Sequence, residues 1–208
     1  MLLSRQKKFL FVHIQKTAGS SLRQALTAAV PDLGPFLGTH DHAAWARPHL
    51  GADWPDVFKA AFVRNPWDRL VSWYAMIREQ DAATNRFWEY VRRRARSFEE
   101  FLLHCTDTVE DHDGRKSILF NQLDYLTDER GEVIVDFIGR YESLEQDAAP
   151  LFRRLNVNAV LPHVNGSRHG HYSAYYTDRT RDLVALRYRR DIDHFGYTFE
   201  AQRPFAPK

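Results

Sequence analysis

One local arrangement occurs twice in this chain and constrains the fold more than any other feature: a short apolar run that leads directly into a polar turn. Residues 9–14 are mostly bulky or β-branched, and residues 15–20 after them are polar and contain a glycine. Residues 59–64 repeat the apolar run, and Asn65 then starts a turn that continues with a proline. Asparagine caps helices well, and proline is favoured at the first helical position. Both stretches therefore predict a buried strand that feeds a helix.

The rest of the chain alternates between strand-like and helix-like patterns. Strand composition returns at residues 133–136 and 137–142, after a turn at 128–131, and helical patterns cover residues 66–79, 143–155 and 178–193, with one or two helices at 85–105. This alternation predicts an α/β fold of three layers, with a central, mostly parallel sheet flanked by helices. Such sheets bind ligands at the carboxyl ends of their strands. The polar turns after residues 14 and 64 both fall at such ends, so we expect them to face one ligand.

Size and composition indicate a single globular domain over residues 1–208. Chains usually divide only beyond about 250 residues. A content of 44% hydrophobic and 27% charged residues is typical of a globular protein. The formal net charge of +2 is too small for a polycation, so we expect no nucleic-acid partner. The sequence leaves the oligomeric state open.

The cysteine and apolar content favour a cytoplasmic protein. Cys105 is the only cysteine, which excludes an internal disulfide and a cysteine-rich zinc site. No stretch approaches the roughly 18 apolar residues of a membrane span, and the run at 9–14 lacks the cleavage site of a secretory signal. We therefore expect a soluble protein with no transmembrane segment.

The first polar turn has the composition of an anion-binding loop, here called the 16–21 loop. A helix N-terminus offers backbone N–H groups and the positive end of the helix dipole. Lysine adds a full charge, glycine lets the backbone approach an anion, and hydroxyls add donors; the loop consists of Lys16, Thr17, Ala18, Gly19, Ser20 and Ser21. Because the lysine precedes the glycine, the loop does not match the phosphate loop of nucleotide triphosphatases. Taken alone, it fits an ordinary strand-to-helix connection equally well.

The second turn adds a candidate phosphate ligand. Arg64 ends the second strand, and Ser72 lies about two helical turns further on. An arginine fork suits a phosphate dianion, and a serine hydroxyl supplies one more donor. In the alternative interpretation, Arg64 pairs with Asp68 and Ser72 is an exposed surface residue.

Several blocks of the sequence together resemble the sulfotransferase family 2 domain, a group of carbohydrate sulfotransferases that includes heparan sulfate 2-O-sulfotransferase. The blocks are residues 13–22, 62–74 and 137–142, and the resemblance continues through residues 163–167 and 188–197. It extends over nearly the whole chain. The block from Arg64 to Ser72 is its most specific part.

The resemblance implies a P-loop-like fold and a sulfuryl donor, 3'-phosphoadenosine-5'-phosphosulfate (PAPS). The 16–21 loop matches the family's loop for the 5'-phosphosulfate, and Arg64 and Ser72 match the pair that holds the 3'-phosphate. Ser167 and Arg168 fall in the loop that closes over the nucleotide in relatives. The implied acceptor is a hydroxyl of a carbohydrate or glycoside. Lysine and arginine already balance the donor's charge, so we expect no metal ion.

Sulfuryl transfer needs a base for the acceptor hydroxyl and a cation for the leaving phosphate. Lys16 is the candidate cation. The candidate bases are His40 and His42, because histidine titrates near neutrality and relatives carry their catalytic histidine at this distance before the second strand. The sequence does not separate the two. If they lay on a strand, both would share a face and Asp41 would point away, so we expect no metal site there.

Two other functions are consistent with parts of the sequence. A kinase would need a true phosphate loop and a magnesium-binding acid after an apolar strand, a place that Asp136 formally fills. A non-catalytic module for nucleotides or polyanions would keep the fold without turnover. The basic cluster at 91–96 is either a guide for an acidic polymer or a solvated helix face. Acceptor selectivity is expected in the loops at 33–54 and 106–116.

Overall fold

The computed structural model describes residues 1–79, 86–106, 118–162 and 170–200, with residues 86 and 87 described by their backbone alone. The chain forms two compact units. The first comprises Met1–Arg64 and Phe120–Gly166, and the second comprises Asn65–Leu119 and Ser167–Lys208. The single domain expected over residues 1–208 stays a prediction.

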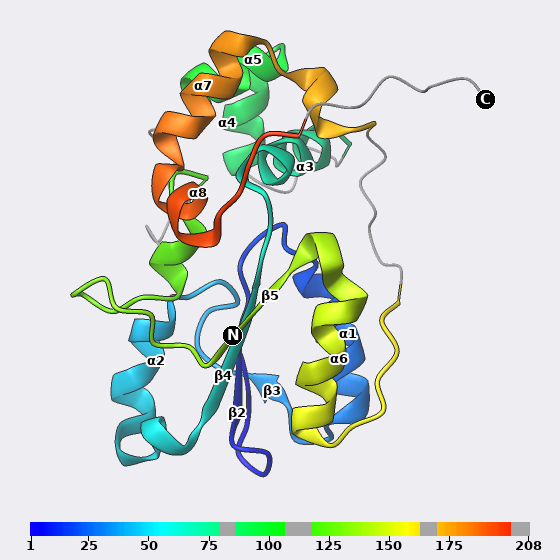
Figure 1. Cartoon of the computed structure of the whole chain (residues 1–208), viewed down its shortest axis with the longest axis vertical. Helices are drawn as coiled ribbons and strands as arrows, with labels where there is room; N and C mark the ends of the chain where they lie inside the picture. Colours follow the sequence, from blue (N-terminus) through cyan, green and yellow to red (C-terminus); the bar gives the residue numbers. More distant parts are fainter. Residues whose placement is uncertain (80–85, 107–117, 163–169, 201–208) are drawn as a thin grey trace. The chain divides into compact units, whose positions relative to one another are not determined.

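The first unit is built on a sheet that has five strands in the described residues (Figure 1). The strand order is β3 (Gly34–Pro35), β1 (Leu2–Ser4), β2 (Phe9–Val12), β4 (Phe58–Val63) and β5 (Phe137–Arg140). β2 pairs in parallel with β4, and β4 with β5, whereas β1 is antiparallel to both β2 and β3. Four of these five strands therefore run in one direction, which confirms the mostly parallel sheet predicted from the sequence.

Helices cover both faces of this sheet. α1 (Gly19–Ala29) and α6 (Leu144–Leu155) lie on one side of it, and α2 (Ala43–Leu50) lies on the other (Figure 1). Phe9 and Phe11 belong to the core cluster beneath α1 and α6. They share that face because alternate residues of a strand point the same way. The unit thus has the three layers expected of an α/β fold.

The two strand-to-helix stretches of the sequence are both present, as β2 leading to α1 and β4 leading to α3 (Pro66–Glu79). The strand expected at 137–142 is β5 followed by the short 3-10 helix η4 (Tyr141–Ser143). Two further 3-10 helices, η1 (Gly51–Asp56) and η3 (Gln122–Tyr125), connect other elements of the unit.

The strand predicted at 133–136 is wrong. Val133 forms only an isolated bridge with Thr127. Asp136 accepts a hydrogen bond from the backbone N–H of Lys59 at 2.7 Å, and its carboxylate lies 3.1 Å from the Lys59 ammonium. These contacts hold Asp136 beside the first residues of β4. The 16–21 loop lies at the opposite, carboxyl ends of the parallel strands. A magnesium-binding acid for a nucleotide at that loop is therefore not found at Asp136.

The second unit contains helices and no strand in the part of it that the structure describes. It contains α3, α4 (Arg86–Arg94), α5 (Phe98–Cys105), η5 (Tyr172–Tyr175), α7 (Asp178–Arg187) and α8 (Arg189–Phe195). The helix predicted at 66–79 is confirmed, and Asn65 caps it by accepting the backbone N–H of Trp67 at 3.1 Å. The helix predicted at 178–193 is divided in two near Tyr188. None of the described helices in either unit has both the length and the apolar composition needed to cross a membrane.

Candidate active site

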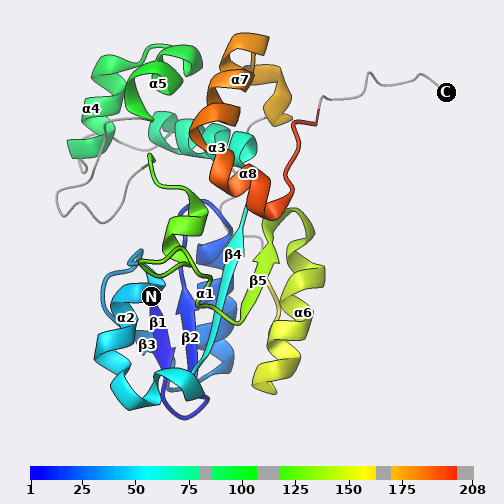
Figure 2. The ribbon, with the colours of Figure 1, turned by 60° about the vertical axis from the view of Figure 1, so that its left-hand side comes forward.

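The ends of β2 and β4 bring the two polar turns of the sequence together within the first unit. Figure 2 shows the arrows of β2, β4 and β5 directed toward the same edge of the sheet. Val12 of β2 pairs with Ala61 of β4, near the ends of these two strands. Beyond them, Nη1 of Arg64 donates a hydrogen bond to the backbone carbonyl of Lys16 at 3.2 Å. One direct contact therefore joins the 16–21 loop to Arg64, the residue directly after β4.

The backbone of the 16–21 loop is held in an uncommon conformation. Lys16 and Ala18 have φ values of 67° and 65°, in the left-handed region that residues with a Cβ rarely adopt. Thr17 between them is buried, and its hydroxyl donates to the carbonyl of Ile14 at 3.0 Å. This buried hydrogen bond ties the loop to Ile14, close to the end of β2. Alternation of left-handed and right-handed residues turns successive N–H groups toward one concavity, which is a common arrangement for anions.

The amino end of α1 keeps its positive partial charge. Its N-cap is Ala18, whose methyl group has no atom that could accept a hydrogen bond, and the first turn, Gly19, Ser20 and Ser21, carries no carboxylate. Ser20 is exposed, whereas Ser21 is buried. The sequence suggested that Thr17 adds a hydroxyl donor for a ligand, but its hydroxyl proton is already directed to Ile14. The Thr17 hydroxyl therefore stabilises the loop itself.

His13 lies between β2 and the 16–21 loop and was not singled out by the sequence analysis. Its side chain is buried. A Cβ built on Gly19 would come within 1.8 Å of Nε2 of His13, a distance that no real structure tolerates. A side chain at position 19 would force the His13 ring to shift, which adds a packing reason to the role expected for Gly19 in admitting an anion. The only sequence signal for His13 was its place at the start of the 13–22 block.

His40 is fixed by a hydrogen bond to His13. Nδ1 of His40 lies 2.8 Å from the backbone carbonyl of His13, and the two rings meet edge to face with centroids 4.5 Å apart. A carbonyl only accepts, so Nδ1 of His40 carries the proton of this bond. In the neutral imidazole the lone pair then resides on Nε2. The side chain is partly exposed, so this lone pair belongs to a residue that solvent reaches.

His42 has different surroundings. It is the N-cap of α2, and its ring is enclosed by Trp45, Tyr125 and Phe120 at centroid distances of 4.6, 4.4 and 5.1 Å. Its Nε2 is buried and has no hydrogen-bond partner among the described residues. Burial lowers the pKa of His42. Residues 40–42 lead into α2 and do not form a strand, so the condition under which His40 and His42 would share a strand face is not met.

Arg64 is buried and held at both its backbone and its guanidinium. Its backbone N–H donates to Oε1 of Gln122 at 2.8 Å, and Nε2 of Gln122 donates to the Arg64 carbonyl at 2.7 Å. The guanidinium lies 3.8 Å above the ring centroid of Tyr141. This stacking contributes about 1–2 kcal/mol where water is excluded. Gln122 and Tyr141 were missed as supporting residues, since neither stands out in the sequence next to Arg64.

The other three predicted site residues either belong to the second unit or fall outside the described residues. Ser72 is on α3 in the second unit and is buried, so the interpretation of Ser72 as an exposed surface residue is wrong. Ser167 and Arg168 fall outside the described residues. Among the residues that the structure does describe, no three His, Cys, Asp or Glu side chains are grouped so as to hold a metal ion.

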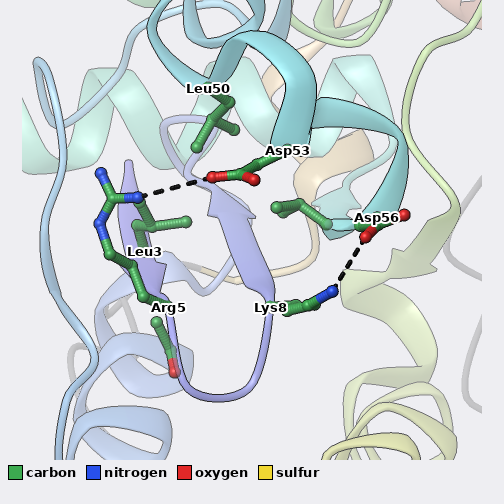
Figure 3. Close-up of a pocket in the computed structure, with 8 residues that line it drawn as sticks. Leu3, Arg5, Lys8, Leu50, Asp53 and Asp56 are labelled. Carbon is green, nitrogen blue, oxygen red and sulfur yellow. Dashed lines mark hydrogen bonds and ion pairs between the residues drawn. The ribbon is translucent and has the colours of Figure 1, made fainter.

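A pocket lies at the other ends of the strands, near the start of β2 and β4 (Figure 3). It contains two basic and two acidic side chains. Lys8 is 2.9 Å from Asp56, and Arg5 is 3.9 Å from Asp53. These charges balance in pairs, so the pocket lacks the excess positive charge of a phosphate site.

Comparison with known proteins assigns the chain to a family. The model described as the sulfotransferase family matches residues 1–198 of the 208, a range that includes the first unit and all but the last ten residues of the second. No curated protein matches the chain.

Proposed function

The chain belongs to the sulfotransferase family, and from this premise we propose that it transfers a sulfuryl group from PAPS to a hydroxyl of a carbohydrate or glycoside. The observation that supports the donor most directly is the hydrogen bond from Arg64 to the Lys16 carbonyl. It places a buried guanidinium beside a loop whose backbone and lysine suit a phosphosulfate. PAPS differs from ATP by its 3'-phosphate, and a second cationic site is what that group requires.

In this proposal the 16–21 loop binds the 5'-phosphosulfate. The left-handed residues and the amino end of α1 direct N–H groups at the anion, and Lys16 adds its ammonium. Arg64 binds the 3'-phosphate. The family resemblance adds Ser72, Ser167 and Arg168 to the donor site, and these three assignments rest on the sequence alone.

His40 is proposed as the general base in place of His42. Its Nδ1–H is held by the His13 carbonyl, so Nε2 is the nitrogen that can accept a proton. Nε2 of His42 is buried among aromatic rings, where an acceptor hydroxyl would have to displace packed side chains. A base must come within about 3 Å of the proton that it removes. Because Nε2 of His42 is enclosed, His40 satisfies that condition more easily.

The proposed reaction is a direct displacement at sulfur. Nε2 of His40 takes the proton of the acceptor hydroxyl while its oxygen bonds to sulfur, and the bond from sulfur to the 5'-phosphate oxygen breaks with its electron pair. Lys16 and the N–H groups of α1 neutralise the charge that develops on that phosphate. Adenosine 3',5'-bisphosphate leaves. With these positive groups in place, the proposal includes no divalent ion.

Titration calorimetry on the full chain tests the donor. Adenosine 3',5'-bisphosphate should bind at least about tenfold more tightly than ADP or ATP, because only the first ligand has a 3'-phosphate. Arg64→Ala should remove this preference, whereas Arg130→Ala, at an exposed turn of the same unit, should keep it. Equal affinities for the three nucleotides would reject the donor, and a preference for ATP would favour a kinase.

Transfer of radioactive sulfate from labelled PAPS tests turnover. The acceptor panel comprises a glycosaminoglycan, a neutral oligosaccharide and a simple glycoside. Labelled product from any of the three supports the proposed function. Tight binding of the bisphosphate with no transfer to any hydroxyl compound would instead indicate a non-catalytic nucleotide-binding module.

A further inference from the structure

We propose that His13 is a positioning residue that sets the place of the base His40 relative to the 16–21 loop. The inference rests on the proposed function for its catalytic meaning, but its geometry belongs to the first unit alone. His13 directly follows β2, so the sheet holds its backbone. Its ring contacts the first residue of α1 on one side and the ring of His40 on another.

The ring fits closely against the start of α1 at Gly19. The position that a Cβ of residue 19 would take is 1.8 Å from Nε2 and 1.9 Å from Cδ2 of His13. Gly19 has no positive φ, so its backbone conformation alone does not demand glycine. The space that the missing side chain leaves is filled by the imidazole. The ring of His13 therefore fits directly against the start of the anion-binding helix.

The contact with His40 has two parts. The His13 carbonyl receives the Nδ1–H of His40 at 2.8 Å, and the His13 ring supports the His40 ring at 4.5 Å. On a further side the His13 ring stacks on Phe11, with centroids 5.9 Å apart and planes at 25°. Held between Phe11 and Gly19, the ring has little freedom to move. Its position is transmitted to the ring of His40.

The electrostatics of His13 suit support rather than proton transfer. Burial is the main cause that lowers its pKa well below the usual value, and repulsion by His40 when that ring is protonated, by the amino group of Met1 and by Arg23 acts in the same direction. His40 lies in the turn before α2, Met1 directly before β1 and Arg23 on α1, so these groups approach His13 from three different elements. A ring that resists protonation in this way does not collect the proton of an acceptor. It can, however, hold the neutral ring of His40, which takes up that proton in the proposed reaction.

One side chain thus links the donor loop to the base. A displacement of about 1 Å in a catalytic group can lower a rate about 100-fold. Because the His13 ring sets the position of His40, its size affects turnover even though the ring contacts neither substrate. The same link predicts that residues 13 and 19 are coupled. The clash that a side chain at 19 would cause depends on the ring at 13 occupying that space.

A double-mutant cycle on the full chain tests this coupling with PAPS and whichever acceptor the labelled-sulfate panel identifies. His13→Ala should lower kcat about 10- to 100-fold with less than about a threefold change in acceptor KM or in affinity for adenosine 3',5'-bisphosphate. Gly19→Ala should lower kcat by pushing the ring against His40. Gly19→Ala combined with His13→Ala should be no slower than His13→Ala alone, because the shorter side chain at 13 vacates the space. Additive losses, or an unchanged kcat in His13→Ala, would overturn the proposal.

Nitrogen-15 NMR of the imidazoles provides a test that needs no turnover. In the unmodified chain His40 should be the Nδ1–H tautomer, and His13 should stay neutral at a pH where free imidazole is half protonated. His13→Gln, which restores a side chain of similar reach, should return more of that His40 tautomer than His13→Ala does. A mixed tautomer of His40 in the unmodified chain would overturn the positioning role. If sulfate transfer fails while the NMR results hold, the proposed function is wrong and the positioning of His40 by His13 stands.

Discussion

Gln122 and Arg64 exchange two hydrogen bonds, one in each direction, between a side-chain amide and a backbone peptide group. The distances are 2.8 and 2.7 Å, and Gln122 has no exposed surface. The pair closes the end of β4 at the point where the chain leaves the sheet. The amide of one residue thereby fixes the backbone from which the guanidinium of the other extends.

Gln122→Ala should therefore affect both stability and donor binding. It leaves the N–H and carbonyl of Arg64 without their buried partners, which should cost about 2–3 kcal/mol in the free energy of unfolding. Affinity for adenosine 3',5'-bisphosphate should fall as well, because the arginine loses its support. Gln146→Ala on the exposed face of α6 is the matched control and should change neither quantity. Urea denaturation and calorimetry provide the two measurements; a variant as stable as the control contradicts the role given to Gln122.

The two candidate bases should respond differently to substitution. His40→Ala should lower kcat by about 10²–10⁴-fold while nucleotide affinity stays within about threefold, as expected for loss of a general base. His42→Ala removes a ring that packs against Trp45 and Tyr125, so its main effect should be a lower melting temperature. His49→Ala, at an exposed position of the same helix, serves as the control for turnover. The reverse pattern, with catalysis lost only in His42→Ala, would transfer the role of base to His42.

The lowered pKa values of His13 and His42 also make stability depend on pH. The pKa of His42 is lowered by burial, and that of His13 is lowered further by the same cause. In the unfolded chain both rings take up protons near pH 6.5, so below that pH the unfolded state binds more protons than the folded state. Stability should therefore fall as the pH is lowered from about 6.5 toward the folded-state pKa values, by at most about 1.4 kcal/mol per histidine and pH unit.

Urea denaturation at pH 7.5, 6.5 and 5.5 measures this dependence. His42→Phe keeps an aromatic ring against Trp45, Tyr125 and Phe120 but cannot titrate, so the decline below pH 6.5 should be shallower than in the unmodified chain. If the two proteins lose stability equally, burial of His42 does not contribute to the effect.

Much of the fold was predictable because its main elements carry local signals. The apolar runs before residues 14 and 64 are long enough to indicate strands, and the asparagine and proline at 65 and 66 define the start of α3. β1 and β3 were missed, since they have only three and two residues. Such strands depend on their neighbours: β1 exists because the chain turns back at residues 5–8 and pairs with β2.

The candidate site was predictable only in its charged residues. Lys16 and Arg64 are conspicuous as cations at the ends of strands, and their hydrogen bond agrees with the expectation of a common edge. The supporting contacts were not predictable, because they join distant parts of the chain. His13 meets His40 across 27 positions, and Gln122 meets Arg64 across 58. A single sequence contains no periodicity that pairs such residues.

Asp136 provides the last prediction and separates the proposed function from a kinase. Its carboxylate is bound to Lys59, whose buried ammonium also donates to the carbonyls of Trp54 and Val57. Asp136→Asn should destabilise the chain by about 1 kcal/mol, a modest loss because the carboxylate is 45% exposed and partly screened by solvent. Affinity for adenosine 3',5'-bisphosphate should not change with or without magnesium. A kinase that used Asp136 for magnesium would instead lose magnesium-dependent ATP binding in this variant, and calorimetry with both nucleotides distinguishes the two results.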